Sequence, residues 1–219
     1  MEHRKKIEDL LVNGVSHVGV TLSDEAISKF VVYFHELCQW NAKVNLTSLS
    51  DESDIIVNLF VDSLAGSHAF DLDSAPSLAD IGSGGGFPGI PLKIAFPQIS
   101  LTLIEPKKKK TAFLHHIIGK LSLDRSMVKA NTIQEFVKNK PADWSCDVVA
   151  SKAIRPEDIF PAAISLLHPE GQMCMYRSQS LGEANSYYGM NLNREMSYEL
   201  PYGYGMRILS ILKPISHDE

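Results

Sequence analysis

A run of glycines that follows a short apolar stretch is the feature that most constrains the fold of this chain. The stretch from Leu78 to Ile81 leads into Gly-Ser-Gly-Gly-Gly-Phe-Pro-Gly at residues 82–89. Glycines let the backbone turn sharply and let a ligand lie against bare main chain. The sequence therefore predicts an α/β fold in which a strand opens into a ligand-binding loop.

The spacing of the glycines bears on the ligand. Counted from the strand, Gly82, Gly84 and Gly86 form the pattern GxGxG, which suits S-adenosylmethionine better than NAD. A frame shifted to Gly84, Gly86 and Gly89 does satisfy the dinucleotide pattern GxGxxG. However, that frame starts three residues after the strand and places Pro88 inside the loop. The spacing therefore favours S-adenosylmethionine over NAD as the cofactor, but a glycine match alone is weak, and the residues around the loop must decide.

Charge is distributed unevenly along the 219 residues. The total is a formal net charge of −5, which argues against a protein that is basic overall and binds nucleic acid by charge alone. Residues 51–80 hold seven acidic residues and no Lys or Arg, whereas residues 101–140 hold nine basic residues against three acidic ones. We expect any RNA or phosphate partner to bind the second of these regions.

Composition also bounds the compartment and the class of site. An apolar fraction of 44 % excludes a disordered chain. Three cysteines lie far apart without metal-ligand spacing, so we expect reduced thiols and no metal site. No apolar run approaches the roughly 18 residues that a membrane span needs. We expect a cytoplasmic monomer without a membrane contact.

The chain divides into two parts by pattern. Residues 23–44 carry apolar side chains at helical spacing behind Ser23, a suitable N-cap, and residues 52–69 are also helical in pattern. A polar, proline-containing linker follows at residues 71–77. We therefore expect an N-terminal helical extension at residues 1–72 and a second domain at residues 73–219.

In the second domain short apolar strands alternate with helical patterns, which favours right-handed βαβ crossovers and a parallel sheet. Two further strands joined by a Pro-Tyr-Gly-Tyr-Gly turn end the chain. A terminal antiparallel hairpin beside a mostly parallel, seven-stranded sheet is typical of Rossmann-like class I methyltransferases. The expected strands are 77–81, 100–104, 126–129, 146–150, 171–176, 195–200 and 206–212, and the expected helices are 89–96, 107–121, 132–139 and 157–167.

Two acidic residues stand where the first two strands end. Ligands of open parallel sheets bind beyond the carboxyl ends of the strands, and the turn after the first strand is the favoured place. Asp80 lies directly before that turn, and Glu105 closes the second strand, Leu-Thr-Leu-Ile-Glu. A carboxylate at the second position can accept hydrogen bonds from both ribose hydroxyls of an adenosyl group. We therefore expect Asp80 and Glu105 to bind the cofactor.

Basic residues follow three of the expected strands. Lys107, Lys108, Lys109 and Lys110 occupy a helix start, where the helix dipole disfavours cations, so we interpret them as an RNA-binding patch beside the cofactor. Lys152 follows the strand Cys-Asp-Val-Val-Ala at the carboxyl edge, where a lysine can bind a carboxylate or a phosphate. Arg177, after the fifth strand, is placed to reach RNA or the methylated base.

Four segments together resemble a known family. They are WNAKVNLTSLSDESDIIVNLFVDS, LADIGSGGGFPGIPLKIAFP, TLIEPKKKKTAFL and DVVASKA, and they lie between about residues 25 and 177. In order and spacing they resemble the bacterial glucose-inhibited division protein B family, which is described as the small-subunit rRNA guanine-N7 methyltransferases. The resemblance fades after Arg177.

This resemblance implies a methyltransferase that uses S-adenosylmethionine to modify one guanosine in a loop of 16S rRNA. It implies cofactor contacts at Gly82, Phe87, Ile133, Gln134 and Lys152. For the reaction itself, our hypothesis is that a carboxylate such as Asp62 favours the positive charge that develops on the guanine ring. We thus name Asp62, Lys152 and Arg177 as the candidate catalytic residues.

The chain departs from the family pattern at several of these positions. The family usually has Ala or Val followed by Glu where Ile133-Gln134 stands, Arg where Lys152 stands, and an Arg-His pair where Asn58-Leu59 stands. It usually has Leu-Lys-Gly where this chain reads Tyr-Arg-Ser at residues 176–178. Arg and Lys are not equivalent at a bidentate contact. Either the same guanosine is held by changed contacts or the substrate differs.

Other functions stay open at this point. One alternative is a methyltransferase of a small molecule or a protein, for which the lysine run would be dispensable. Another is a noncatalytic protein that binds RNA or the ribosome and retains the fold although its substrate residues have decayed, for which cofactor binding would be weak or absent. An NAD-dependent enzyme is a more distant possibility, and the cofactor that protects the fold from heat would distinguish it.

Overall fold

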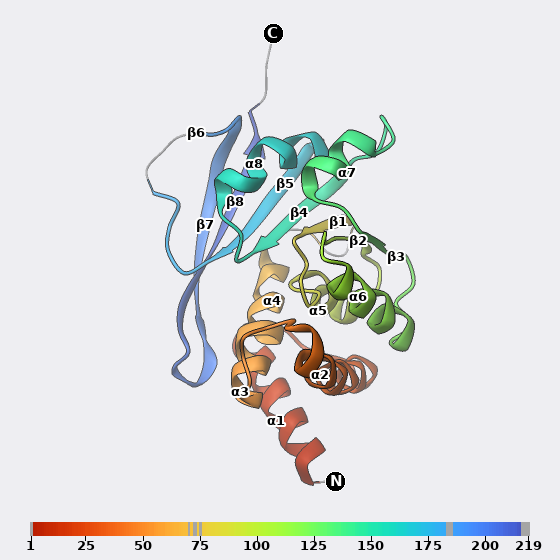
Figure 1. Ribbon diagram of the computed structural model, residues 1–219. Helices are drawn as coiled ribbons and strands as arrows, with labels where there is room; N and C mark the ends of the chain where they lie inside the picture. The colour runs from red at the N-terminus through yellow and green to blue at the C-terminus, as the bar shows by residue number, and fades with distance from the viewer. Residues whose placement is uncertain (1, 70, 72–73, 75, 183–185, 216–219) are drawn as a thin grey trace.

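One mixed β-sheet forms the centre of the computed structural model, which describes residues 2–69, 71, 74, 76–182 and 186–215 (Figure 1). Its strands follow the order β3-β2-β1-β4-β5-β8-β7-β6. β1 to β5 are parallel, whereas β8 and β7 run antiparallel to their neighbours. The strands are β1 (Ser77–Ile81), β2 (Ser100–Ile104), β3 (Ser126–Lys129), β4 (Cys146–Lys152), β5 (Leu167–Arg177), β6 (Ser186–Tyr187), β7 (Met190–Leu200) and β8 (Gly205–Pro214).

The expected sheet is confirmed, with longer strands near its end. All seven expected strands are present, and the short β6 is added at the edge. The terminal hairpin is longer than its apolar pattern, because β7 begins at Met190 and pairs with β8 over its whole length. Figure 1 shows this hairpin reaching past the sheet toward α1 and α3. The helices that accompany the sheet are α5 (Gly89–Ala95), α6 (Lys108–Lys120), α7 (Ile133–Asn139) and α8 (Pro156–Ala163), followed by the 3₁₀ turn η3 (Ile164–Leu166).

Side chains of the central strands alternate between two apolar layers. Leu78 of β1 packs with residues of α2, α5 and α6, whereas Ala79 and Ile81 pack with residues of α7 and α8. Successive side chains of a strand point to opposite faces, so strands with helices on both sides must be apolar throughout. This is why β1 and β2 are mostly apolar, and their interior exceptions, Asp80 and Thr102, are both buried.

The N-terminal helices cover the first of these faces. α2 (Asp24–Val44) begins behind the N-cap Ser23 as expected and contacts α5 and α6. α1 (Glu2–His17), which the sequence analysis did not include, buries Ile7, Leu11 and Val15. The expected boundary between residues 72 and 73 lies outside the described residues and stays a prediction.

The helical stretch expected at residues 52–69 is present, but its geometry changes along its length. It consists of α3 (Glu52–Ile55), the π-helical turn η1 (Ile56–Val61), α4 (Asp62–Ala65) and the 3₁₀ turn η2 (Gly66–His68). A π-helical turn is rare and occurs frequently at functional sites. The tip of the β7–β8 hairpin, the 3₁₀ turn η4 (Pro201–Gly203), lies beside this stretch, because the Tyr204 hydroxyl donates to Asp54.

Candidate functional site

The order of the strands places a switch point between β1 and β4. From β1 the chain moves outward to β2 and β3, and it then returns to β4 and β5 on the other side of β1. In open α/β sheets ligands bind at such a point, beyond the carboxyl ends of the strands. The glycine loop follows β1, and Lys152 ends β4, so both lie at this edge.

The glycine loop adopts backbone conformations that other residues avoid. Gly82, Gly84 and Gly86 have φ values of 68°, 57° and 99°. A Cβ atom at Gly82 would lie 2.2 Å from the Cδ1 atom of Ile154, in the segment after β4. The loop therefore needs glycine for its backbone and also for the close approach of Ile154.

Asp80 is fully buried beneath the loop. Its Oδ2 atom accepts a hydrogen bond of 2.9 Å from the Gly89 amide, whereas Oδ1 has no hydrogen-bond partner. Burial raises the pKa of Asp80 to about 7, and the nearby Glu105 carboxylate also raises it. A buried polar atom without a partner is unusual. Together with the bare glycine backbone, it fits an edge built to receive a polar ligand.

Glu105 lies against the glycine loop, as its place after β2 predicted. Its two carboxylate oxygens accept hydrogen bonds of 2.9 Å from the amides of Gly84 and Lys107. An ionised carboxylate can accept about four hydrogen bonds, so these contacts leave capacity for ligand hydroxyls. Glu105 thus shapes the loop, but it is only 4 % exposed and does not line the pocket beside the loop, so its contact with ribose hydroxyls stays a prediction.

An apolar pocket of about 230 Å³ opens beside the loop, and three of the expected cofactor residues line it: Gly82, Ile133 and Gln134. Ile133 is buried at the start of α7, and the exposed Gln134 donates from Nε2 to the Asp158 carbonyl at 3.4 Å. A mostly apolar pocket of this size suits a purine ring. Its walls are formed by Ile81, Gly82, Ile104, Pro106, Asn131, Thr132, Ile133, Gln134, Ile154, Asp158 and Ile159.

Phe87 lies elsewhere, in an aromatic cluster under the N-terminal helices. Its ring lies 5.5 Å from the Tyr33 ring and 5.7 Å from the Phe60 ring, and it does not line the apolar pocket. The Tyr33 hydroxyl donates to the Gly85 carbonyl. Through this cluster, residues of α2 and η1 pack against the glycine loop. A direct contact of Phe87 with the cofactor stays a prediction.

A second pocket, of about 320 Å³, lies on the other side of Ile154 and brings the three candidate catalytic residues together. Its walls are formed by Asp62, Lys152, Ala153, Ile154, Tyr176, Arg177, Ser178, Gln179 and Arg207. Ile154 lines both pockets, so they are neighbours across the switch point. An extended ligand in the first pocket can therefore reach toward a substrate in the second.

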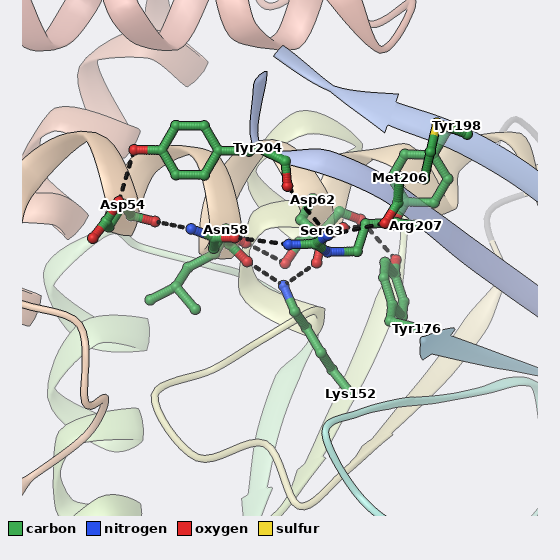
Figure 2. Close-up of polar contacts among 11 residues, drawn as sticks. Asp54, Asn58, Asp62, Ser63, Lys152, Tyr176, Tyr198, Tyr204, Met206 and Arg207 are labelled. Carbon is green, nitrogen blue, oxygen red and sulfur yellow. Dashed lines mark hydrogen bonds and ion pairs between the residues drawn. The ribbon is translucent and has the colours of Figure 1, made fainter. Parts of the chain in front are cut away.

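Lys152 and Asp62 form an ion pair inside this second pocket (Figure 2). The Lys152 Nζ atom lies 2.7 Å from Asp62 Oδ2, and it also donates to the main-chain carbonyl of Asn58. The Tyr176 ring centroid lies 5.8 Å from Nζ, and the Tyr198 hydroxyl donates to Asp62 Oδ1. Both carboxylate oxygens of Asp62 thus have partners, and a role of Asp62 in favouring the developing charge stays a prediction.

Two arginines give this pocket its charge. Arg177 uses Nε to donate to the Gln179 carbonyl at 3.0 Å and lies at the pocket wall, as expected for the end of β5. Arg207 of β8 donates from Nη2 to Asn58 Oδ1 at 3.1 Å. Because Lys152 and Asp62 offset each other, these guanidinium groups leave the pocket positive, which suits a phosphate-bearing substrate.

The four lysines of the expected RNA patch surround the start of α6. Lys107 is the N-cap residue, and Lys107, Lys108 and Lys109 are exposed. Lys110 is half-buried and points back to the loop. A Cβ atom added at Gly84 would lie 3.8 Å from the Lys110 Nζ atom. The run therefore divides into three exposed side chains and one that reaches the glycine loop.

Arg207 and Tyr198 are the site residues that the sequence analysis missed. Both lie in the terminal hairpin, whose strands were expected but whose fold onto Asp62 and Asn58 was not. The available signal, for Arg207 only, was a single cation inside a mostly apolar segment, Met-Arg-Ile-Leu-Ser-Ile-Leu. Among the described residues no cluster of potential metal ligands occurs, and no described helix is long and apolar enough to cross a membrane.

Solved structures with a similar fold are methyltransferases. A putative O-methyltransferase from Klebsiella pneumoniae superposes with a TM-score of 0.58 at 11 % identity, over 83 % of this chain and 90 % of that chain. The ribosomal protein L11 methylase from Lactobacillus delbrueckii subsp. bulgaricus gives a TM-score of 0.51 at 12 % identity, over 76 % of this chain and 80 % of that chain. At such low identity these likenesses establish the Rossmann-like methyltransferase fold.

Sequence relatives are more specific. The ribosomal RNA small subunit methyltransferase G of Staphylococcus epidermidis is 32 % identical over 206 residues, which cover 90 % of this chain and 86 % of the relative. That of Oceanobacillus iheyensis is 38 % identical over 143 residues, 65 % of this chain and 60 % of the relative. The model of the GidB family, described as rRNA small subunit methyltransferase G, matches residues 26–192. The match includes the glycine loop, the whole apolar pocket and every wall residue of the second pocket except Arg207, and the protein belongs to the GidB family of rRNA small subunit methyltransferases.

Proposed function

We propose that this protein transfers a methyl group from S-adenosylmethionine to N7 of a guanosine in a loop of 16S rRNA. The observation that carries the proposal is the pair of pockets that share Ile154, one apolar beside the glycine loop and one lined by cations. The first suits an adenosyl group and the second suits a nucleotide. Membership of the GidB family supports the same assignment.

The residues present fit this cofactor. Gly82 and Gly84 would offer bare backbone to the cofactor, and Glu105 would offer carboxylate oxygens to its ribose hydroxyls. Ile133 and Gln134 line the apolar pocket, which would hold the adenine ring. Asp80 has one buried oxygen without a partner. Bound there, S-adenosylmethionine would supply an electrophilic methyl group on a positively charged sulfur.

The reaction needs alignment more than acid–base chemistry. Guanine N7 has an in-plane lone pair and no proton, so the N7–carbon bond can form while the carbon–sulfur bond breaks without a general base. The positive charge moves from sulfur to the imidazole ring of guanine. Holding the reacting atoms in line can contribute several kcal/mol, in the manner of intramolecular reactions.

Lys152, Arg177 and Arg207 would bind rather than react. Two of the three N–H groups of Lys152 have acceptors on Asp62 and Asn58, which leaves one for a carboxylate or phosphate in the pocket. The guanidinium groups of Arg177 and Arg207 suit phosphates of the bound nucleotide. Asp62 would act by holding Lys152 in place.

The substrate would be a guanosine outside a regular helix. The major groove of A-form RNA is too deep and narrow for side chains to reach N7, so a loop or an extruded base is expected. Lys107, Lys108 and Lys109 would bind the flanking backbone, whereas Lys110 faces the cofactor loop. We further propose that the protein acts as a monomer in the bacterial cytoplasm, where its substrate is made.

The test is methyl transfer from labelled S-adenosylmethionine to small subunits, and to naked 16S rRNA, from cells that lack this enzyme. Chain cleavage at 7-methylguanosine then maps the product, and a single cleavage site in a loop is the expected result. Cofactor binding by calorimetry without label in RNA would instead indicate a small-molecule or protein substrate. The absence of cofactor binding would indicate a noncatalytic ribosome-binding protein, and thermal protection by NAD alone would indicate a dehydrogenase.

A further inference from the structure

The terminal hairpin is attached to the helical stretch by a row of three hydrogen bonds between side chains, in addition to the bonds from Arg194 to the carbonyls of His68 and Ala69. On the helical stretch the acceptors stand four residues apart, a spacing that places side chains on one face of a helix. The donors all come from β7, β8 and the turn between them. The pairs are Tyr204 with Asp54, Arg207 with Asn58, and Tyr198 with Asp62 (Figure 2).

The contact at Asp62 differs from the other two because Asp62 also forms an ion pair with Lys152. Tyr198 donates to Oδ1, and the other oxygen, Oδ2, lies 2.7 Å from Lys152 Nζ. Asp62 is only 4 % exposed, so water cannot readily replace a lost partner. The hydroxyl therefore fixes the rotation of the carboxylate, and that rotation directs Oδ2 to the lysine.

Tyr198 is well suited to be a permanent donor. Burial and the adjacent Asp62 carboxylate hold the pKa of its hydroxyl far above the ordinary value, so the proton stays on the oxygen at physiological pH. In the sheet Tyr198 is paired directly with Arg207, and directly paired residues point to the same face. The hairpin thus brings the donor for Asp62 and the cation at Asn58 together.

We propose that Tyr198 is a positioning residue of the transfer site, which acts through Asp62 to hold the Lys152 ammonium group at the edge of the cationic pocket. This proposal rests on the proposed function, because that function is what makes the position of Lys152 matter for methyl transfer. The Tyr198 side chain reaches the lysine through one carboxylate and needs no contact of its own with cofactor or substrate.

The chain offers a matched pair of variants. Tyr198→Phe removes the hydroxyl that binds Asp62 and keeps the packed ring, whereas Tyr204→Phe removes an equivalent hydroxyl that binds Asp54 at 2.7 Å. Both changes delete one tyrosine–carboxylate hydrogen bond between the hairpin and the same helical stretch. Only the first touches the carboxylate that binds Lys152, so the second measures the purely structural effect of loosening the hairpin.

The experiment measures kcat for RNA methylation, the Kd of S-adenosylmethionine, and the order of the Lys152 side chain by ¹³C NMR relaxation, with the signal assigned through Lys152→Arg. We expect Tyr198→Phe to lower kcat about tenfold, the size of one hydrogen bond to a charged group, and to make the lysine side chain more mobile. Tyr204→Phe should change neither quantity by more than about twofold, since it leaves Asp62 intact. In an Asp62→Asn background, Tyr198→Phe should cause no further loss of kcat.

Equal losses in the two tyrosine variants, or an effect of Tyr198→Phe that persists in the Asp62→Asn background, would overturn the proposal. If wild-type protein does not methylate RNA, the proposed function fails by itself. The NMR comparison still decides the positioning role in that case, because unchanged order of the Lys152 side chain in Tyr198→Phe would reject it without reference to activity.

Discussion

The Asp80 carboxylate and the Gly89 amide, joined by a hydrogen bond of 2.9 Å, tie the end of β1 to the start of α5 across the whole glycine loop. The loop between them is closed a second time by Glu105, which accepts from the Gly84 amide. Two carboxylates thus shape one loop, and each is largely withdrawn from water. Their burial has a measurable consequence for stability.

We predict that Asp80 makes folding less favourable as pH rises. Burial raises the pKa of Asp80 to about 7 from an ordinary value of 3.8. Between these values the folded state keeps a proton that the unfolded state has released, so the contribution of Asp80 falls from pH 4 to about pH 7 and is constant above. Asp80→Asn removes this dependence. The free energy of unfolding of the variant minus that of wild type should therefore increase as pH rises from 4 to about 7, as measured by urea titration at several pH values.

Asp147 provides a control of opposite sign. Burial opposes ionisation there, but hydrogen bonds from the hydroxyl and amide of Ser77 outweigh it and lower the pKa of Asp147. Its contribution to stability is therefore present at neutral pH and is lost as pH falls through the lowered pKa. Asp147→Asn should cost most at neutral pH. Parallel pH profiles for the Asp80 and Asp147 variants would contradict the assignment.

A second prediction concerns the contact between Gly66 and Tyr176. A Cβ atom at Gly66 would lie 1.8 Å from the Tyr176 hydroxyl oxygen, which donates to the Ser63 carbonyl at 2.7 Å. The Gly66 backbone is helical, so only this clash opposes a larger residue. Gly66→Ala should lower the free energy of unfolding by about 1–3 kcal/mol, as overpacking does, and should displace the ring beside Lys152. Chemical denaturation measures the loss.

Gly119 in α6 is the matched control for this substitution. A Cβ atom there would meet no atom within 4 Å, so Gly119→Ala should be neutral or should stabilise the fold by up to about 1 kcal/mol through helix propensity. Equal effects of the two changes on the urea midpoint would mean that the Tyr176 contact does not limit residue 66.

The exposed lysines at the start of α6 should control RNA binding without affecting the cofactor. Lys108→Gln combined with Lys109→Gln is expected to weaken RNA binding and to reduce the slope of log K against log salt by about 0.7 for each lost contact with single-stranded phosphate. Lys110→Gln should instead weaken S-adenosylmethionine binding, because Lys110 faces Gly84. Lys138→Gln, an exposed change on α7, serves as the control. Filter binding at several salt concentrations and calorimetry separate the two effects.

The sequence predicts those residues of the site that lie at or beside the carboxyl end of a strand. The glycine loop, Asp80 and Glu105 follow from strands that end at one edge, and the parallel order of β1 and β2 brings them together. Lys152 and Arg177 follow from the same rule, because they end β4 and β5. Local periodicity is enough to locate such residues.

The hairpin contacts lie beyond that reach. The pair Tyr198–Asp62 spans 136 residues, and Arg207–Asn58 spans 149. No periodicity in either segment states that a strand will fold against a helical stretch that far away. α1 was missed for a different reason, since its buried residues Ile7, Leu11 and Val15 do stand at helical spacing but lie among many charged ones. An apolar stripe is easily overlooked where most of the residues around it are charged.

The last prediction separates substrate binding from cofactor binding through Arg207. Its guanidinium group lines the cationic pocket and donates to Asn58 Oδ1, and it lies apart from the apolar pocket. Arg207→Gln should therefore raise KM for RNA and lower kcat/KM by about tenfold or more, as expected for a lost charged hydrogen bond, while the Kd of S-adenosylmethionine stays within about twofold. Arg4→Gln is the control, because Arg4 is exposed on α1, pairs with Glu8 at 2.8 Å and lines neither pocket. Equal losses in the two arginine variants would indicate a general effect of positive charge, whereas a loss of cofactor affinity in Arg207→Gln would place this arginine at the cofactor.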